Sequence, residues 1–452
     1  IPAGHVKAIY SDGAGSGAAM VDAFTDLNLA GTTTTSSLNV SSDLDVDGTA
    51  NLDVVDIDGA VDMASTLQVD GAITFSSTLN GIDILADTTN FTDSILISQN
   101  ASTGTLSSAT DNTGLGDSVF AALTSGTQNT AVGSEALDAN TTATGNTAFG
   151  YRSLTANTTG DRNVALGWSA MSVNVDGDRS VAVGYAALQN QEPASNVDMY
   201  NTVVGYNAGN SISTGTKNTA LGGLALDALT TPNENTAIGY NASSSTTTGG
   251  QNTALGAESL ATNTTGASNT ALGYGALFSN TTANFNTAVG RNALLANTTG
   301  AGNIAIGYNA GSALTTGGNN TVVGTNALIT QTTATNNTAI GSGAMEANTS
   351  GSNSVAVGLG ALAVNTTGSN NVAIGVNALD ANTTADDNIA IGRLALTANT
   401  TGQYNTAVGR DALEANTTAN YNTAFGYDSL KSNTTGTRNT GLSPFSLDAC
   451  TT

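Results

Sequence analysis

Apolar and polar positions recur every 17 residues along most of the chain. Each unit contains the pentad Asn-Thr-Ala-apolar-Gly, and Asn286 to Gly302 shows the full pattern, Asn-Thr-Ala-Val-Gly-Arg-Asn-Ala-Leu-Leu-Ala-Asn-Thr-Thr-Gly-Ala-Gly. The pentad glycines are Gly116, Gly133, Gly150, Gly167, Gly184, Gly205, Gly222, Gly239, Gly256, Gly273, Gly290, Gly307, Gly324, Gly341, Gly358, Gly375, Gly392, Gly409 and Gly426. Every interval is 17 residues except the one of 21 between Gly184 and Gly205. A fixed period of this kind indicates an array of stacked structural repeats.

The unit predicts one short β-strand followed by turns. Seventeen residues are too few for the helix pairs of helical repeats, and frequent Gly, Thr and Val oppose helix. Successive residues of a strand point to opposite faces, so the pentad Ala and the apolar residue after it must both be covered. The interior of the coil covers one face. The other face requires a second surface, most simply a neighbouring chain.

The repeat therefore predicts an all-β chain, with a parallel β-solenoid or β-roll of about 20 coils over residues 112–452. Residues 189–196 contain four additional residues and a proline, which predict a loop at the edge of one coil. Asparagines of the Asn-Thr-Thr runs are expected to form a ladder that closes a turn. Three units have Gly209, Ser243 and Gly311 where most have Leu, which favours an alternative turn conformation there.

The segment before the repeat has a different pattern. Residues 31–111 contain short alternating runs separated by Gly or polar residues, such as Leu44-Asp45-Val46-Asp47-Gly48, and predict a β-rich fibre shaft without a core of its own. Residues 101–111 are expected to be its joint to the repeat. Paired aspartates in these runs are compatible with Ca²⁺ binding or with solvated charge on an outer face. Residues 1–30 predict a connector or a small β element.

Composition excludes several classes of function. The formal net charge of −24 disfavours binding to phosphate backbones, so no nucleic-acid partner is expected. No run of 18 apolar residues occurs, so no membrane insertion of this segment is expected. The only histidine is His5 and the only cysteine is Cys450, which leaves no Cys/His metal cluster and no Ser-His-Asp or Cys-His set. We therefore expect no enzymatic activity, cofactor or metal.

One column of the repeat is rich in aromatic residues. The residue after the pentad glycine is Tyr151, Trp168, Tyr185 and Tyr206 in four successive units, and tyrosine again at 240, 274, 308 and 427. Stacked coils would align the four consecutive rings. If the rings are exposed, they form a candidate contact surface for the apolar faces of host glycan rings. The alternative is packing at a turn or at a seam between protomers.

Some pentads resemble a known family. Ser180-Val181-Ala182-Val183-Gly184, Ser354-Val355-Ala356-Val357-Gly358 and Asn371-Val372-Ala373-Ile374-Gly375 are similar to the head repeats of YadA-like trimeric autotransporter adhesins. The resemblance implies a left-handed, homotrimeric parallel β-roll. The upstream segment is similar to shaft segments of bacteriophage tail fibres, in which three chains intertwine, and cyanophage-type virion fibres often join such a shaft to Asn-Thr-Ala-x-Gly repeats.

These resemblances imply a function and a location. We expect a structural fibre of a phage virion, a tail or head fibre on the virion surface that acts as a rigid trimeric spacer for host attachment. Its partners would be two sister chains, virion tail or capsid proteins and a host surface glycan. The alternative is a trimeric autotransporter-type adhesin on the bacterial outer surface. An enzyme carried on a solenoid would require clustered acidic residues in a groove, and the repeats have no such cluster.

Overall fold

The computed structural model describes residues 9–11, 20–22, 82–99 and 103–452, which belong to two separate units, residues 1–73 and 74–452. In the first unit, β1 (Ile9–Ser11) pairs antiparallel with β2 (Met20–Asp22), within the span for which a connector or small β element is expected. Of the shaft predicted over residues 31–111, residues 31–81 with their paired aspartates lie outside the described residues.

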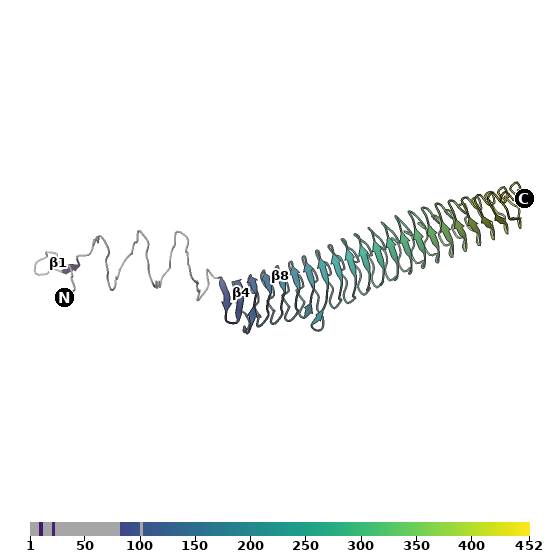
Figure 1. Ribbon diagram of the computed structural model, residues 1–452. Helices are drawn as coiled ribbons and strands as arrows, with labels where there is room; N and C mark the ends of the chain where they lie inside the picture. Colours follow the sequence, from purple (N-terminus) through teal and green to yellow (C-terminus); the bar gives the residue numbers. More distant parts are fainter. Residues whose placement is uncertain (1–8, 12–19, 23–81, 100–102) are drawn as a thin grey trace. The chain divides into compact units, whose positions relative to one another are not determined.

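The second unit is a parallel β-solenoid (Figure 1), and this confirms the predicted fold class. Each pentad supplies one three-residue strand, and each strand pairs in parallel with the equivalent strand of the next coil, as Thr253–Leu255 does with Thr270–Leu272. The described residues contain no helix and make about 20 turns of roughly 17 residues. At about 4.8 Å per stacked strand, 20 turns rise roughly 95 Å.

The ladder of pentad strands comprises β6 (Thr113–Leu115), β7 (Thr130–Val132), β8 (Thr147–Phe149), β9 (Val164–Leu166), β11 (Val181–Val183), β13 (Thr202–Val204), β14 (Thr219–Leu221), β15 (Thr236–Ile238), β16 (Thr253–Leu255), β17 (Thr270–Leu272), β18 (Thr287–Val289), β19 (Ile304–Ile306), β20 (Thr321–Val323), β21 (Thr338–Ile340), β22 (Val355–Val357), β23 (Val372–Ile374), β24 (Ile389–Ile391), β25 (Thr406–Val408), β26 (Thr423–Phe425) and β27 (Thr440–Gly441).

The ladder begins upstream of residue 112, where the repeat was expected to start. β3 (Asp83–Thr88) and β4 (Phe91–Ser98) form an antiparallel hairpin, and β4 pairs in parallel with both β5 (Ala109–Thr110) and β6. Phe91 and Leu96 on β4 are fully buried against the first coils. Their alternation with exposed residues lets β4 cover the apolar end of the stack, although its sequence lacks the pentad.

The four-residue insertion protrudes from the stack as a loop, as the sequence predicts (Figure 1). A short additional strand, β12 (Val197–Asp198), pairs in parallel with β10 (Gly177–Asp178) beside the main ladder. Glu192 Oε2 accepts a hydrogen bond from the Val175 amide at 2.9 Å, and the Asn196 side chain donates to the Thr159 carbonyl at 3.1 Å. The loop is therefore fastened to the preceding coils by side-chain contacts.

The core is a narrow column of small residues and one large aliphatic side chain per typical coil. In the coil of Gly133, the strand centre Ala131 and the turn residues Ala136 and Leu137 are all fully buried. Leu137 has a φ of 49°, a left-handed conformation that is uncommon for leucine. The residues that directly follow Leu137 do not have positive φ angles. The single left-handed residue turns the chain so that the adjacent side chains of Ala136 and Leu137 both face the interior.

The three units with Gly or Ser in place of the large apolar residue keep the same backbone, so the predicted alternative turn conformation is wrong. Gly209, Ser243 and Gly311 have φ values of 53°, 52° and 58°, close to the 49–55° of the leucines at the same position. Ile212 and Leu314 are fully buried three residues later, at the position where most coils have Asn. The large side chain has moved to another point of the same interior, which fills the core without a change of turn.

Two columns of buried asparagine hold successive coils together. The Asn280 amide donates to Asn263 Oδ1 in the coil before it at 2.8 Å and to the Ala283 carbonyl of its own turn at 3.2 Å, which confirms the predicted turn-closing ladder. The pentad asparagines form a second ladder. Asn269 Oδ1 accepts from the Asn286 backbone amide at 3.0 Å, and the Asn269 side chain donates to the Ala283 carbonyl at 2.8 Å.

The outer side of each pentad strand is the face that a single chain leaves uncovered. The strand centre is buried, whereas the apolar residue after it is exposed or half-buried, as predicted from strand geometry. Leu221 is 46% exposed and Phe425 is 59% exposed. In the coils of the ladder, the first and third strand positions are Thr, Val, Ile, Leu or Phe, and none of them is charged. The result is one continuous, uncharged face along the rod.

Candidate functional site

The aromatic column lies just beyond the end of each pentad strand. Its position is fixed by the backbone, because the carbonyl of each column residue accepts a hydrogen bond from the next coil: the Ser169 amide donates to Tyr151 O and the Ala186 amide donates to Trp168 O, both at 2.9 Å. The glycine before the column residue has a φ between 124° and 143° in every coil. Side chains at this position therefore project from the same place in each coil.

The structure brings the four predicted rings together in one stack. Ring centroids are 5.9 Å apart for Tyr151 and Trp168, 4.8 Å for Trp168 and Tyr185, and 5.3 Å for Tyr185 and Tyr206. The rings of Trp168 and Tyr185 are nearly parallel, at 3°. Each side chain keeps a large exposed fraction, from 39% at Tyr151 to 58% at Tyr206.

Stacking limits what these rings can bind. Glycan rings contact aromatic side chains face to face, and the inner faces of this stack are covered by neighbouring rings. Trp168 and Tyr185 offer mainly their edges to solvent. At one end of the stack, the Arg152 guanidinium lies 5.9 Å from the Tyr151 centroid and is ion-paired with Glu135 at 2.9 Å. Tyr206, at the other end, is the most exposed of the four residues.

Beyond Tyr206 the column changes to an alternating pattern. Tyr240, Tyr274 and Tyr308 occupy every second coil, and Gly223, Ala257 and Arg291 occupy the coils between. Because these tyrosines lie in every second coil, their rings are separated by twice the distance between neighbouring coils and do not stack directly on one another. A hydrogen bond with Glu258 raises the pKa of the Tyr274 hydroxyl.

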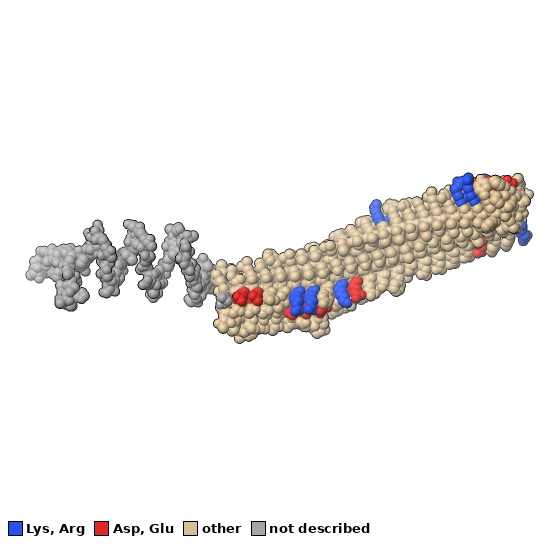
Figure 2. Space-filling model, viewed as in Figure 1, with Lys and Arg blue, Asp and Glu red and all other residues tan. Residues whose placement is uncertain are grey.

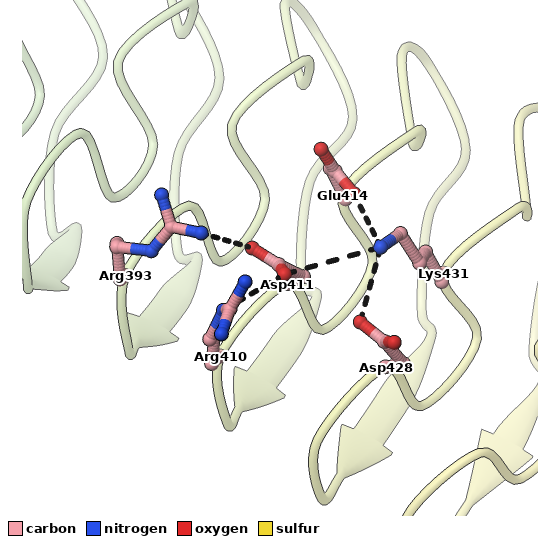
Figure 3. A network of polar contacts seen from close by, with 6 residues as sticks. All are labelled: Arg393, Arg410, Asp411, Glu414, Asp428 and Lys431. Carbon is pink, nitrogen blue, oxygen red and sulfur yellow. Dashed lines mark hydrogen bonds and ion pairs between the residues drawn. The ribbon is translucent and has the colours of Figure 1, made fainter.

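A second group of polar side chains, which sequence reasoning missed, lies near the end of the rod (Figure 3). Asp411 has a side chain only 5% exposed and contacts Arg393 at 3.8 Å, Arg410 at 3.1 Å and Lys431 at 3.9 Å. Lys431 also contacts Glu414 at 3.3 Å and Asp428 at 3.2 Å. The hydrogen bond to Asp428 raises the pKa of Lys431.

The charges of this group balance, since three cations meet three carboxylates. The six residues come from three successive coils, so their contacts tie those coils together. Only the repeat spacing, combined with the side-chain directions of the turns, places them in contact. The arrangement is a network of ion pairs between successive coils.

Carboxylates beside the insertion have altered proton affinities. Burial raises the pKa of Asp178, although the hydrogen bond that its Oδ1 accepts from the Asp161 amide at 2.7 Å acts in the opposite direction. Burial also raises the pKa of Glu192. Arg179 forms an ion pair with Asp198 across the β10–β12 pair. The hydrogen bond of Glu192 and the ion pair of Asp198 join the inserted segment to the neighbouring coils.

Among the described residues, no group of three or more His, Cys, Asp and Glu side chains could hold a metal ion. The described segments also contain no helix long and apolar enough to cross a membrane. Cys450 is partly buried, and its Sγ contacts the Thr452 carbonyl at 3.3 Å, whereas His5 lies outside the described residues.

Comparison of the chain with protein-family models, with curated proteins and with solved structures found no match.

Proposed function

We propose that the chain is a structural fibre protein of a phage virion, a tail or head fibre that acts as a rigid homotrimeric spacer for host attachment. The observation that carries this proposal is the uncharged face along the pentad strands. With three-residue strands about 10 Å long and coils about 4.8 Å apart, 20 coils make a face on the order of 1,000 Å². The apolar residues at the third strand position make up about half of this face, and monomeric proteins rarely expose apolar patches larger than a few hundred Å².

The occupant of this face is a sister chain. The chain carries 34 acidic and 10 basic residues, yet none lies at the exposed strand positions of the ladder. Charged side chains gather elsewhere in small groups separated by long uncharged stretches, as Figure 2 shows for one side of the rod. Three identical rods placed side by side would bury this face along its whole length. The resemblance of the pentads to YadA-like head repeats supports a threefold arrangement.

Rigidity follows from the bonding of each coil to the next. Strand ladders, turn backbones and both asparagine columns connect successive coils, so bending would stretch hydrogen bonds on one side of the rod. A stiff rod roughly 95 Å long can hold a receptor-binding end away from the particle. Its mechanism is mechanical, and it needs virion tail or capsid proteins at one end.

Immunogold labelling tests this proposal directly. Antibodies raised against residues 112–452 would be applied to virus particles and to intact cells from a culture that carries the gene. The proposal predicts gold on the appendages of virions. Labelling confined to the cell surface would overturn it and would favour the autotransporter-type adhesin instead.

A further inference from the structure

The alternating part of the aromatic column contains an open slot between Tyr206 and Tyr240. These tyrosines stand two coils apart, and the coil between them has Gly223 at the column position. Two coil rises separate the rings by about 9.6 Å. Because the Tyr206 ring stacks on Tyr185 at 5.3 Å with an interplanar angle of 16°, its other face is turned along the rod toward this slot.

An equivalent gap two tyrosines further along is filled. The Arg291 guanidinium lies 5.9 Å from the ring centroids of both Tyr274 and Tyr308. The chain itself therefore places a group between two tyrosines separated by two coils. The slot between Tyr206 and Tyr240 has the same spacing, but its central residue carries no side chain.

The backbone conformation at Gly223 does not require glycine, so a larger residue could occupy this position. Its φ is outside the left-handed region, unlike that of Gly222 before it, so the backbone does not demand glycine. A methyl group added at Gly223 would meet nothing closer than Tyr240 Cδ2 at 3.8 Å. Tyr206 and Tyr240 are 58% and 59% exposed, more than any other ring of the column. The slot is therefore open to solvent.

The size of the slot favours a puckered ring. A flat group in van der Waals contact with both tyrosines fills only about 7 to 8 Å, because carbon atoms approach to about 3.5–4.0 Å. A pyranose chair is thicker, and its C–H bonds project from both faces, so it fits the remaining space. C–H groups on the apolar face of a sugar are suitable partners for the electron-rich face of tyrosine.

The surroundings of the slot favour a neutral ligand with hydroxyl groups. The residues on either side of the column in these three coils are uncharged: Val204, Leu221, Ile238, Asn207, Leu224 and Asn241. A cation in the slot would have no carboxylate at these positions to pair with, unlike Arg291, whose neighbour Tyr274 contacts Glu258. Asn207 and Asn241 are partly exposed, and side-chain amides can both donate hydrogen bonds to sugar hydroxyls and accept them.

We infer that the slot formed by Tyr206, Gly223 and Tyr240 binds one pyranose ring of a saccharide between the two tyrosine rings. The slot belongs to three successive coils of one chain, so the inference does not rest on the proposed virion role. It also narrows the predicted glycan contact, which comprised all four rings from Tyr151 to Tyr206, to the Tyr206 end of that stack and extends it to Tyr240.

The test compares the full chain with two arginine variants. Gly223→Arg places in the slot the side chain that already fills the equivalent gap, and Ser342→Arg adds the same charge at an exposed column position without flanking aromatic rings. Binding is measured on an array of glucose, galactose, mannose and N-acetylhexosamine oligosaccharides, and in solution by calorimetry with the oligosaccharide that binds best. Solution mass and circular dichroism of each variant establish that the rod is intact.

The inference predicts that the wild-type chain and Ser342→Arg bind at least one oligosaccharide equally, and that Gly223→Arg binds it about tenfold more weakly or worse. Tyr240→Leu is expected to give a similar loss. Absence of oligosaccharide binding by the wild-type chain would overturn the inference, as would equal binding by Gly223→Arg. Binding of N-acetylarginine amide in the slot without saccharide binding would identify it as a guanidinium site and would also overturn the inference.

Discussion

The pentad glycine is the residue on which close stacking of the coils depends. Gly256 has a φ of 138°, and a methyl group added there would lie 2.7 Å from the carbonyl carbon and oxygen of Gly273 in the next coil. Backbone atoms of a neighbouring coil cannot move aside as a flexible side chain can. The position therefore combines a conformation reserved for glycine with a contact distance that excludes Cβ.

Replacement of Gly256 by alanine is expected to destabilise the surrounding coils by about 2 to 4 kcal/mol, through backbone strain and steric overlap. The measurement is hydrogen exchange of the Gly273 amide, which donates to Leu255 O at 2.8 Å. Gly223→Ala is the matched control, because its backbone conformation is ordinary and its surroundings are open. It should change the same exchange free energy by less than about 0.5 kcal/mol. Equal effects of the two substitutions would contradict this account of the pentad glycine.

At the scale of the coil, the sequence predicts the repeat well and its turns poorly. The 17-residue period, the inward Ala and outward apolar residue of each strand, and the Asn ladder all follow from local rules of strand and turn chemistry. The left-handed conformation of Leu137 does not, because it is unfavourable for an isolated leucine and is imposed by the stack. Strand β4, which covers the end of the stack, lacks the pentad, so the 17-residue period does not predict its pairing with β6.

The candidate site was predictable only in part for a similar reason. Sequence spacing places Trp168 and Tyr185 in adjacent coils, and this is enough to predict that their rings stack. Which ring faces stay open depends on the residues between distant tyrosines, above all on the missing side chain of Gly223. The ion-pair group around Asp411 also depends on the directions in which the turn residues point, which no local rule supplies.

The free energy of local opening of the inserted loop should increase as the pH falls. Burial raises the folded-state pKa values of Asp178 and Glu192, so their ionised forms are less favourable in the rod than in the unfolded chain. The resulting stabilisation is fully present below the ordinary carboxyl pKa, near about 4, and is lost as the pH rises through the raised values. Lowering the pH from 7 toward 4 should therefore increase local stability there.

Hydrogen exchange of residues 175–199, corrected for the intrinsic pH dependence of exchange, measures this effect. The Asp178→Asn, Glu192→Gln double variant retains oxygen acceptors for the Asp161 and Val175 amides and removes both titrations. Its local opening free energy should vary less with pH than that of the wild-type chain. Identical pH profiles for the two proteins would show that these carboxylates do not control the loop.

At the scale of the whole molecule, the central claim is that the uncharged strand face is covered by sister chains. A solenoid buries the strand centres by stacking, but stacking leaves the outward residues, such as Leu221 and Phe425, in water. Burial of apolar surface is favourable by about 25 cal/mol per Å², and the periodicity of the face lets a small gain per coil accumulate along the rod. Association is therefore expected to strengthen with the number of coils.

Substitutions on this face should separate association from folding. Leu221→Lys, Leu255→Lys and Leu272→Lys together place three charges on the face and are expected to weaken association of the rods, because each ammonium group would lose its hydration at the interface. The circular dichroism of the strands should remain, since these side chains are 40–46% exposed in one chain. Lysines at Ser342, Thr325 and Ala257, in the column beyond the strands, form the control. A triple variant that associates as firmly as this control would place the contact elsewhere.

The most direct test is the solution mass of the intact chain at micromolar concentration, by sedimentation equilibrium or light scattering. The account predicts a particle of three times the 44.6 kDa mass of one chain, elongated and threefold symmetric in averaged electron micrographs viewed along its axis. A stable, fully folded monomer under the same conditions would contradict it.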